Sequence, residues 1–490
     1  MNIYKKRIGF AILVVTILLS SCLPAPQLVY QDMTPTPIPE EIATSTPFPT
    51  REVYEPGQLV DYIIQDGDTI SALAARFNTT IPEILKENPV IPQTTTTLPP
   101  GMPVKMPIYY RPLWGSANQI IPNSLFVNGP AQRDFDTVQF VEDQPGWLKD
   151  YTVYAYGGER KGGELVDYIA LNYSVSPRLL LAILEYRAEA VSNPNRPPKV
   201  DSNLLGHNRE FFGNLYYQLL WLADSLNNGY YQWLDGKLIS QELLTGELEY
   251  FDPWQNAATI SLKHYFGLIL PADAYYHAVS ADGFAATYRK LFGEVWPDTH
   301  EPIMTGSLQQ PSMKLPFVSG KSWSYTGAPH AVWGEENPWA AIDFAPPSDL
   351  SGCAASIEWA TAVADGVIAR SEPGLAILDL DGDGDERTGW AILYLHLSSS
   401  QAAPQGREMK AGDVVGHPSC ERGRATGTHV HVARKYNGQW VPADGILPFV
   451  MEGWVTHSTG KPYLGSLTKQ SQTVTACSCG DRYSQITSQE

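Results

Sequence analysis

The sequence is short of positive charge and of long apolar segments. It has 34 lysines and arginines against 52 aspartates and glutamates, a formal net charge of −18 over 490 residues. This deficit argues against a nucleic-acid-binding protein, which would need a basic face. No apolar run reaches the roughly 20 residues of a membrane-spanning helix, so we expect the bulk of the chain to be soluble. Charged residues make up only 18% and hydrophobic residues 43%, which excludes global disorder.

The N-terminus has the features of an export signal. Basic residues 5–7 precede the apolar stretch Ile8–Leu19, which is too short to span a membrane. The stretch ends in Leu19-Ser20-Ser21-Cys22, which resembles a bacterial lipobox. The resemblance implies a signal peptide over residues 1–21 and a lipidated Cys22 that anchors the chain to a membrane. The alternative is an ordinary secretory signal in which Cys22 stands by chance.

A proline-rich segment follows. Residues 23–57 contain eight prolines and several threonines, which favour an extended spacer without a core. We therefore expect residues 22–57 to be the lipidated cysteine and a linker that lifts the folded part off the membrane.

Residues 58–108 have the pattern of a small βααβ module. A strand over residues 60–64 is followed by the turn Asp66-Gly67-Asp68, two short helices and a closing strand after Pro100-Gly101. Tyr62-Ile-Ile-Gln-Asp-Gly-Asp-Thr-Ile-Ser-Ala-Leu-Ala, Asn88-Pro89 and Pro100-Gly101 resemble a LysM domain. The resemblance implies peptidoglycan binding in a groove between two loops, with the contacts made by Gly67, Asp68, Thr69, Ile91 and Pro92. The alternative is a small adaptor without a ligand.

Residues 115–305 are rich in helical patterns. Ser176-Pro177 opens an apolar helix, and Tyr173 to Leu184 resembles the first core helix of lytic transglycosylases. Those enzymes place a catalytic glutamate where this chain has Arg187, and Glu185 and Glu189 are two residues out of register. We therefore expect an all-α, lysozyme-like domain without catalysis, which binds glycan through its aromatics or acts as a spacer.

Residues 312–452 change to strand patterns and contain five of the ten histidines. In His429-Val430-His431, alternation along a strand sends both imidazoles to one face and the valine to the other. Two imidazoles on one face suit a metal ligand and an acid–base group. His396 ends a second apolar strand, and His330 stands thirteen residues before Asp343.

These motifs resemble the lysostaphin-like zinc endopeptidases of peptidoglycan, and the His330 to Asp343 spacing is similar to their beta-lytic, or staphylolysin-type, branch. The resemblance implies one Zn²⁺ per chain, bound by His330, Asp343 and His431 with a fourth position for water. It also implies catalytic roles for His396 and His429 and a disulfide between Cys353 and Cys420. Cys477 and Cys479 are separated by one residue, and their pairing stays open.

An acidic segment has two interpretations. Asp379, Asp381, Asp383 and Asp385 match the first half of a calcium-binding loop. The twelfth position is Trp390 rather than glutamate, so the bidentate ligand is missing. The alternative is a tight hairpin with Asp-Gly turns.

Together these patterns predict a multidomain α+β protein: a βααβ LysM module, an all-α middle domain over 115–305, a mainly antiparallel-β peptidase domain over 312–452 and a C-terminal extension over 453–490. The predicted function is a zinc endopeptidase that cuts stem or cross-bridge peptides of peptidoglycan, as a monomer at the extracytoplasmic side of a bacterial envelope. One alternative is a non-catalytic envelope protein that binds the wall or activates a hydrolase. Another is a glycan-cleaving enzyme working through the middle domain.

Overall fold

A computed structural model describes residues 52–207, 213–296, 302–348 and 352–489. The predicted signal peptide and Cys22 lie outside these residues. The described residues belong to one compact unit, Arg51–Glu490. Among them, no helix combines the length and the apolar character needed to cross a membrane.

The first region is a βααβ module, as the sequence predicts. Strands β1 (Gln58–Ile63) and β2 (Pro103–Ile108) pair antiparallel, and helices α1 (Ile70–Arg76) and α2 (Ile81–Glu87) lie between them in sequence. Side chains cap both helices: Thr69 accepts the backbone N–H of Ala72, and Thr80 forms a capping box with Glu83. These caps fix the turn before each helix, which is where the predicted groove lies.

The middle region is mainly helical but not all-α. It contains two short hairpins, β3 with β4 and β5 with β6, whose turns include Gly157 and Gly246 at φ of +84° and +85°. Glycine takes this conformation without the steric cost of a Cβ, so short hairpins form here without a long strand pattern. The helices and strands are α3 (Thr137–Glu142), β3 (Thr152–Ala155), β4 (Gly158–Lys161), α4 (Gly162–Tyr173), α5 (Pro177–Ala188), α6 (Val200–Asn203), α7 (Leu215–Leu234), β5 (Ser240–Glu242), β6 (Leu248–Tyr250), α8 (Ala257–Ile269), α9 (Ala272–Ala278) and α10 (Phe284–Phe292), with 3₁₀ turns at Asn123–Leu125, Pro130–Gln132 and Trp147–Asp150.

The third region is built on one large antiparallel sheet. Its strand order is β13-β10-β11-β12-β15-β8-β7-β21, with β16 paired to β15. The strands of this region are β7 (Ser322–His330), β8 (Ala341–Ala345), β9 (Ala360–Thr361), β10 (Gly366–Glu372), β11 (Leu375–Asp379), β12 (Trp390–Leu395), β13 (Glu408–Met409), β14 (Val414–Gly416), β15 (Val430–Tyr436), β16 (Gln439–Trp440), β17 (Val450–Met451), β18 (Trp454–Lys461), β19 (Leu464–Lys469), β20 (Gln472–Thr475) and β21 (Gln485–Thr487).

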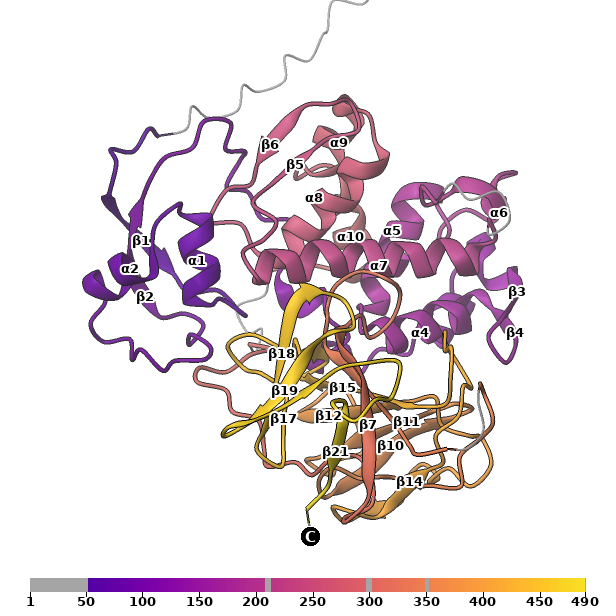
Figure 1. The fold of residues 1–490 in the computed structure, drawn as a ribbon. Helices are drawn as coiled ribbons and strands as arrows, with labels where there is room; N and C mark the ends of the chain where they lie inside the picture. Colours follow the sequence, from indigo (N-terminus) through magenta and orange to yellow (C-terminus); the bar gives the residue numbers. More distant parts are fainter. Residues whose placement is uncertain (1–51, 208–212, 297–301, 349–351, 490) are drawn as a thin grey trace, which may run out of the picture. The chain divides into compact units, whose positions relative to one another are not determined.

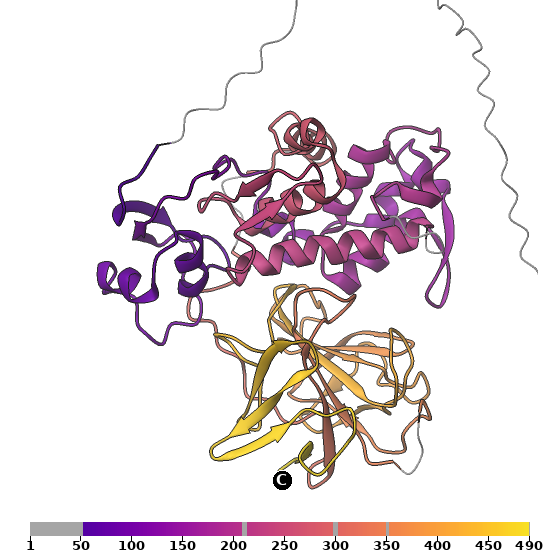
Figure 2. The ribbon, with the colours of Figure 1, turned by 45° about the horizontal axis from the view of Figure 1, so that its top comes forward.

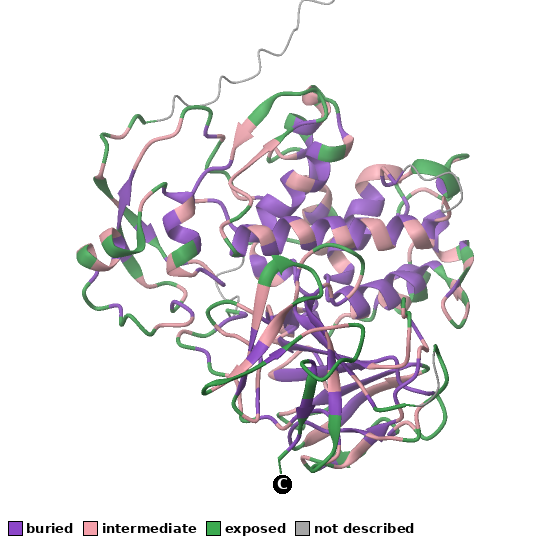
Figure 3. Cartoon of the chain, viewed as in Figure 1, coloured by how far each residue is buried: buried purple, intermediate pink, exposed green. Residues whose placement is uncertain are grey.

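The two faces of this sheet belong to different hydrophobic cores. Val430 and Val432 of β15 point into a core shared with the smaller sheets, whereas Ala433 points to the opposite face. On that opposite face Leu393 and Leu395 of β12 share a core with the helices of the middle region. Figures 1 and 2 show these helices along one side of the strands, and Figure 3 shows buried residues on both the helices and the strands. The middle region thus packs on the face of the sheet to which His431 also points.

The last residues are part of the folded third region. Strands β17, β18, β19 and β20 form a four-stranded sheet, and β21 adds to the edge of the main sheet beside β7. Leu467, Val474 and Ile486 are buried in the same core as Val430. Residues 453–490, which the sequence pattern suggested as an extension, therefore complete the core.

Candidate metal centre

Three ligand-type atoms converge at the end of β7. The His330 Nε2 atom lies 3.1 Å from His431 Nδ1 and 3.3 Å from Asp343 Oδ1, and His431 Nδ1 lies 3.1 Å from the same oxygen. All three residues are buried. The structure thus brings together the three residues that the sequence resemblance assigns to the metal.

Strand register and one glycine position this cluster. His431 pairs with Asp343 across β15 and β8, and Asp343 pairs with Gly327 across β8 and β7. A Cβ at Gly327 would lie 2.3 Å from Asp343 Oδ2, closer than any real contact. A glycine is therefore required where the Asp343 carboxylate rests on β7, and nothing in the local sequence pattern pointed to this role.

Backbone carbonyls fix the tautomers of three histidines. The Nδ1 atoms of His330, His396 and His429 lie 2.8, 3.1 and 2.7 Å from the carbonyl oxygens of Ala328, Glu421 and Gly427. Because a carbonyl only accepts, each Nδ1 carries the proton and each neutral ring keeps its lone pair on Nε2. Three lone pairs are thereby directed away from the backbone.

The cluster fits a zinc ion. With the His330 proton on Nδ1, the Nε2 lone pair and the Asp343 carboxylate point to the same position, an arrangement that a cation stabilises. Zinc bonds of about 2.0–2.2 Å place tetrahedral ligand atoms about 3.3 Å apart, which agrees with the spacing of 3.1–3.3 Å here. Among the described residues, the buried His431 Nε2 atom has no hydrogen-bond partner, so His431 presents Nδ1 to the centre.

His396 and His429 stand beside the cluster. Their ring centres are 4.5 Å apart, and His429 Nε2 lies 3.7 Å from Asp343 Oδ1. His396 directly follows β12 and has a left-handed φ of +64°, a conformation that is costly for a non-glycine residue and is concentrated at functional sites. Burial, with the neighbouring His429 and His431, lowers the pKa of His396 to about 3. His396 is therefore neutral at pH 7 and keeps a lone pair on Nε2.

The charge state of the cluster also suits metal binding. Burial raises the pKa of Asp343, but interactions with the imidazoles of His330 and His429 outweigh this effect and hold the pKa well below its usual value. Burial lowers the pKa of His431. Asp343 thus offers an ionised carboxylate and His431 a neutral imidazole, the forms that bind zinc.

Two long-range features hold the walls of the centre. The Cys353–Cys420 disulfide is present and ties down the segment that carries Glu421, whose carbonyl orients His396. The ring of Tyr463 stacks on His330 with centres 4.1 Å apart, and it comes from the turn between β18 and β19. Tyr463 was not foreseen, because it follows His330 by more than a hundred residues and no motif surrounds it.

The thirteen-residue spacing from His330 to Asp343 accommodates a loop that contacts the middle region. The Glu335 N–H donates to Asp224 Oδ2 at 3.4 Å, and Asn337 Nδ2 donates to Asn228 Oδ1 at 3.0 Å. Asp224 and Asn228 lie on α7. The loop between two ligand strands is therefore supported by the middle region.

Replacing Gly327 with alanine is expected to lower zinc affinity by about 10–100-fold, the scale seen when the groups that orient a metal ligand are disturbed. The added methyl group would displace the Asp343 carboxylate from its place over β7. Zinc titration against a competing chelator measures the effect. Gly158→Ala is the control, since its methyl group meets nothing within 4 Å. Unchanged affinity in Gly327→Ala would show that Asp343 does not need this contact.

The residues predicted to bind glycan have different environments. Asp68 is buried, where its carboxylate pairs with Arg76 at 2.5 Å and accepts the Tyr62 hydroxyl at 2.7 Å. Ile91 is in the core, and Thr69 uses its hydroxyl to cap α1. Gly67 and Pro92 lie on the two loops that flank the predicted groove. Asp68 and Ile91 thus support these loops from inside.

The carboxylates of the middle region are engaged in structure. Glu185 is buried and accepts the backbone N–H groups of Val191 and Ser192 at 2.9 and 3.1 Å, which closes the turn after α5. Glu189 caps α5 and accepts Asn193 Nδ2 at 2.8 Å. Glu185 is thus committed to this turn, whereas Glu189 is exposed at the surface.

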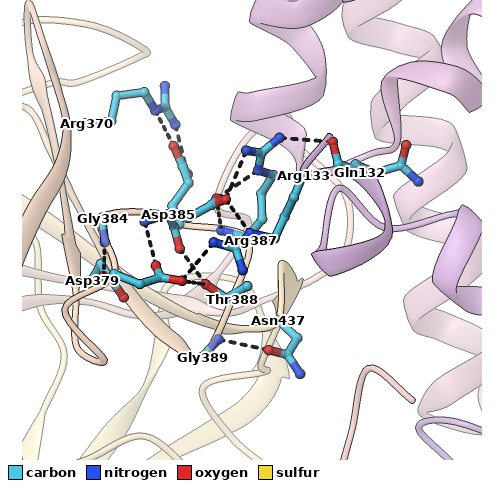
Figure 4. A network of polar contacts seen from close by, with 12 residues as sticks. Gln132, Arg133, Arg370, Asp379, Gly384, Asp385, Arg387, Thr388, Gly389 and Asn437 are labelled. Atoms are coloured by element: carbon cyan, nitrogen blue, oxygen red, sulfur yellow. Dashed lines mark hydrogen bonds and ion pairs between the residues drawn. The ribbon is translucent and has the colours of Figure 1, made fainter. Parts of the chain in front are cut away.

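The acidic loop after β11 is closed by arginines (Figure 4). Asp385 pairs with Arg133 at 3.0 Å and with Arg387 at 2.8 Å, and Arg133 also reaches Asp383 at 3.1 Å. Asp379, Asp381 and Asp383 still bring one oxygen each within 4.8 Å of one another. Burial raises the pKa of Asp379 to about 6. The guanidinium groups supply part of the positive charge that a calcium ion would bring, and calcium binding stays a prediction.

Comparison with known proteins agrees with this arrangement. Residues 62–107 match the LysM domain family, and residues 119–304 match the family "LasA, N-terminal domain" rather than the transglycosylases that the middle region resembled. The chain is 24% identical over 333 residues to Protease LasA of Pseudomonas aeruginosa, in strains UCBPP-PA14 and PAO1, covering 60% of this chain and 74% of that protein.

Two solved structures are also similar to parts of this chain. The M23 metalloprotease pseudoalterin, from the deep sea, is 23% identical with a TM-score of 0.30, covering 34% of this chain and 96% of that one. The catalytic domain of lysostaphin from Staphylococcus simulans is 22% identical with a TM-score of 0.18, covering 25% and 88%. At these scores the structural likeness adds no argument. The expected LysM domain is confirmed by the family match, and the expected resemblance to a peptidase agrees with the sequence match to Protease LasA.

Proposed function

We propose that this chain, in which a LysM domain is joined to a lysostaphin-like peptidase, is a zinc-dependent endopeptidase that hydrolyses peptide bonds of bacterial peptidoglycan. The observation that carries the proposal is the convergence of His330 Nε2, Asp343 Oδ1 and His431 Nδ1 within 3.3 Å of one another. His396 and His429 stand at their side with lone pairs on Nε2. The LysM match supports peptidoglycan as the polymer bound.

The residues divide the chemistry between them. When bound, zinc polarises the scissile carbonyl and lowers the pKa of water towards about 7. His330, Asp343 and His431 hold the ion, with two neutral imidazoles and one carboxylate leaving a net positive charge at the centre. His429 Nε2 accepts a proton from the attacking water and returns it to the leaving amine, and His396 Nε2 accepts a hydrogen bond that orients this water. The carbonyls of Gly427 and Glu421 keep both rings oriented for these transfers.

The proposal extends to the setting of the enzyme. The lipobox-like sequence supports anchoring through Cys22 at the extracytoplasmic face of a membrane, with residues 23–57 as spacer. The retention of every site residue disfavours the non-catalytic alternative, because a binding protein has no need of five converging metal and acid–base groups. The structural engagement of Glu185 and Glu189 disfavours glycan cleavage by the middle region.

Digestion of purified sacculi tests the function. The full chain is expected to release fragments with new free amino groups, with peptide cleavage seen by mass spectrometry and no new reducing or anhydro sugars. A zinc chelator should abolish the release, and added zinc should restore it. Release of sugar ends by the chelated protein would contradict the proposal and support the glycan-cleaving alternative.

A further inference from the structure

A cavity of ≈ 370 Å³ lies where all three folded regions meet. One wall is the turn before α1, a second is the C-terminal end of α7, and a third comes from the peptidase region. Representative lining residues from the three walls are Gly67 and Thr69, Tyr231 and Leu234, and Pro329 and Trp339. The turn that the sequence assigns to glycan binding therefore borders a space that the LysM module does not form alone.

The segment after the middle region fastens the LysM wall. The half-buried Asp66 carboxylate accepts the backbone N–H groups of Ile303 and Met304 at 2.6 and 2.8 Å. On the second loop, the Thr97 hydroxyl donates to the Thr305 carbonyl at 2.6 Å and accepts the Leu308 N–H at 3.0 Å. Residues 303–308 thus bridge the two loops that flank the predicted groove.

A buried arginine fastens the same wall to α7. Arg76 pairs with Asp68 behind the turn, and its other nitrogen, Nη2, donates to the Trp233 carbonyl at 2.7 Å. Gly67 approaches the Leu234 side chain so closely that an added Cβ would lie 2.9 Å from it. The LysM turn and the end of α7 are therefore held as adjacent walls of one site.

The third wall comes from residues next to the strands that hold the metal centre. Pro329 precedes His330 on β7, and Trp339 stands just before β8, which carries Asp343. A ligand in the cavity would therefore lie beside the strands that hold two of the three proposed zinc ligands.

We propose that this cavity binds the amino-sugar part of a peptidoglycan fragment while the peptide attached to that sugar reaches the metal centre. This inference rests on the proposed function and sharpens its substrate class to peptides that still carry their sugar. Peptidoglycan joins a sugar to a short peptide, and the cavity joins a LysM wall to a peptidase wall. This arrangement of the cavity therefore favours cleavage of a stem-peptide bond near the sugar over cleavage of a bond in a distant cross-bridge.

The chemistry of the walls suits a sugar ring. A pyranose offers an apolar face and a rim of polar groups, and Trp339 offers an aromatic surface for the face. Asp235, Lys237 and Asp444 place charged groups at the same cavity. The volume lies at the small end of the roughly 300–1,000 Å³ of small-molecule sites, which fits a short saccharide rather than a long strand.

Two substrates that differ only in the sugar test the inference. One is a disaccharide-tetrapeptide from peptidoglycan, and the other is the same tetrapeptide after enzymatic removal of the disaccharide. The full chain is expected to cleave the sugar-bearing substrate with a kcat/KM at least about tenfold higher. Ser71→Trp, which places bulk at an exposed position of the lining, should reduce that ratio towards one. Trp339→Ala should reduce it by removing the aromatic surface.

Lys86→Trp is the matched control, because it adds the same bulk on exposed α2 away from the lining. It should keep the wild-type ratio. Equal kcat/KM values for the two substrates in the wild-type chain, or the same ratio in all variants, would overturn the inference.

Calorimetric binding separates this inference from the proposed function. If neither substrate is cleaved, the proposed function fails, and binding of the disaccharide-tetrapeptide to the full chain decides the inference alone. The inference is supported if Ser71→Trp weakens this binding by about tenfold and Lys86→Trp leaves it unchanged. Absence of binding, or binding that ignores both Ser71→Trp and Trp339→Ala, overturns it.

Discussion

Replacing Asp343 with alanine is expected to remove the bound zinc and to lower peptide-bond cleavage by about three orders of magnitude. Asp343 supplies the only carboxylate among the three proposed ligands, and its Oδ1 atom lies within 3.3 Å of both ligand nitrogens. A catalytic metal contributes several kcal/mol to the transition state, and about 4 kcal/mol corresponds to roughly a thousandfold in rate. Elemental analysis gives zinc per chain, and cleavage of peptidoglycan peptides gives the rate.

Asp343→Asn separates charge from shape in this experiment. The amide fits the space beside Gly327 and keeps the fold, yet it lacks the negative charge that zinc requires. It should therefore lose zinc almost as alanine does. Asp365→Ala is the control, since Asp365 is exposed on the same domain and pairs with Lys410. One zinc per chain in both Asp343 variants would remove this residue from the ligand set.

The sequence predicted the face of the metal centre because strand alternation is a local property. A strand conformation alone places the imidazoles of His429 and His431 on one face and the side chain of Val430 on the other. Val430 is indeed buried on the opposite face from His431. The βααβ module was equally local, since the Thr69 and Thr80 caps act within three residues. Local patterns of this kind can be interpreted without knowing the rest of the chain.

What the sequence did not predict depends on contacts between distant segments. Tyr463 reaches His330 through the β18–β19 turn, and β21 joins β7 only after the chain has passed through the whole domain. The contact between Arg133 and the acidic loop joins residues about 250 positions apart. No spacing rule links such residues, because the fold and not the chain brings them together.

The middle region shows a further limit of prediction from the sequence. Its resemblance to a transglycosylase helix lay in a few apolar residues, Tyr173 to Leu184, which any buried helix can supply. The more telling feature was the misplaced carboxylate, and the structure gives Glu185 a purely local task in closing the turn after α5. The absence of catalysis in this region stays a prediction.

Replacing His396 or His429 with alanine is expected to keep zinc bound yet lower cleavage by about 100-fold or more, the scale of general acid–base catalysis. Neither ring belongs to the cluster of three ligand atoms, so the metal should stay. Zinc analysis and kcat, measured on the same preparation, check both parts. His417→Ala is the control, because its Nδ1 faces the Glu358 carbonyl and its ring lies 3.5 Å from Trp359, outside the centre. Full activity in both single variants would show that the proton moves through another group.

The double variant distinguishes shared from separate roles. With ring centres 4.5 Å apart, His396 and His429 are close enough to act on one proton, and residues that act as a unit have non-additive effects. If they form one relay, the double variant should lose little more kcat than the single variant with the larger effect. If His429 takes the proton from water while His396 orients that water by accepting its second hydrogen on Nε2, the two fold-losses in kcat should multiply. The carbonyl contacts from Gly427 and Glu421 hold the two rings independently, on separate segments, and this arrangement favours the second outcome.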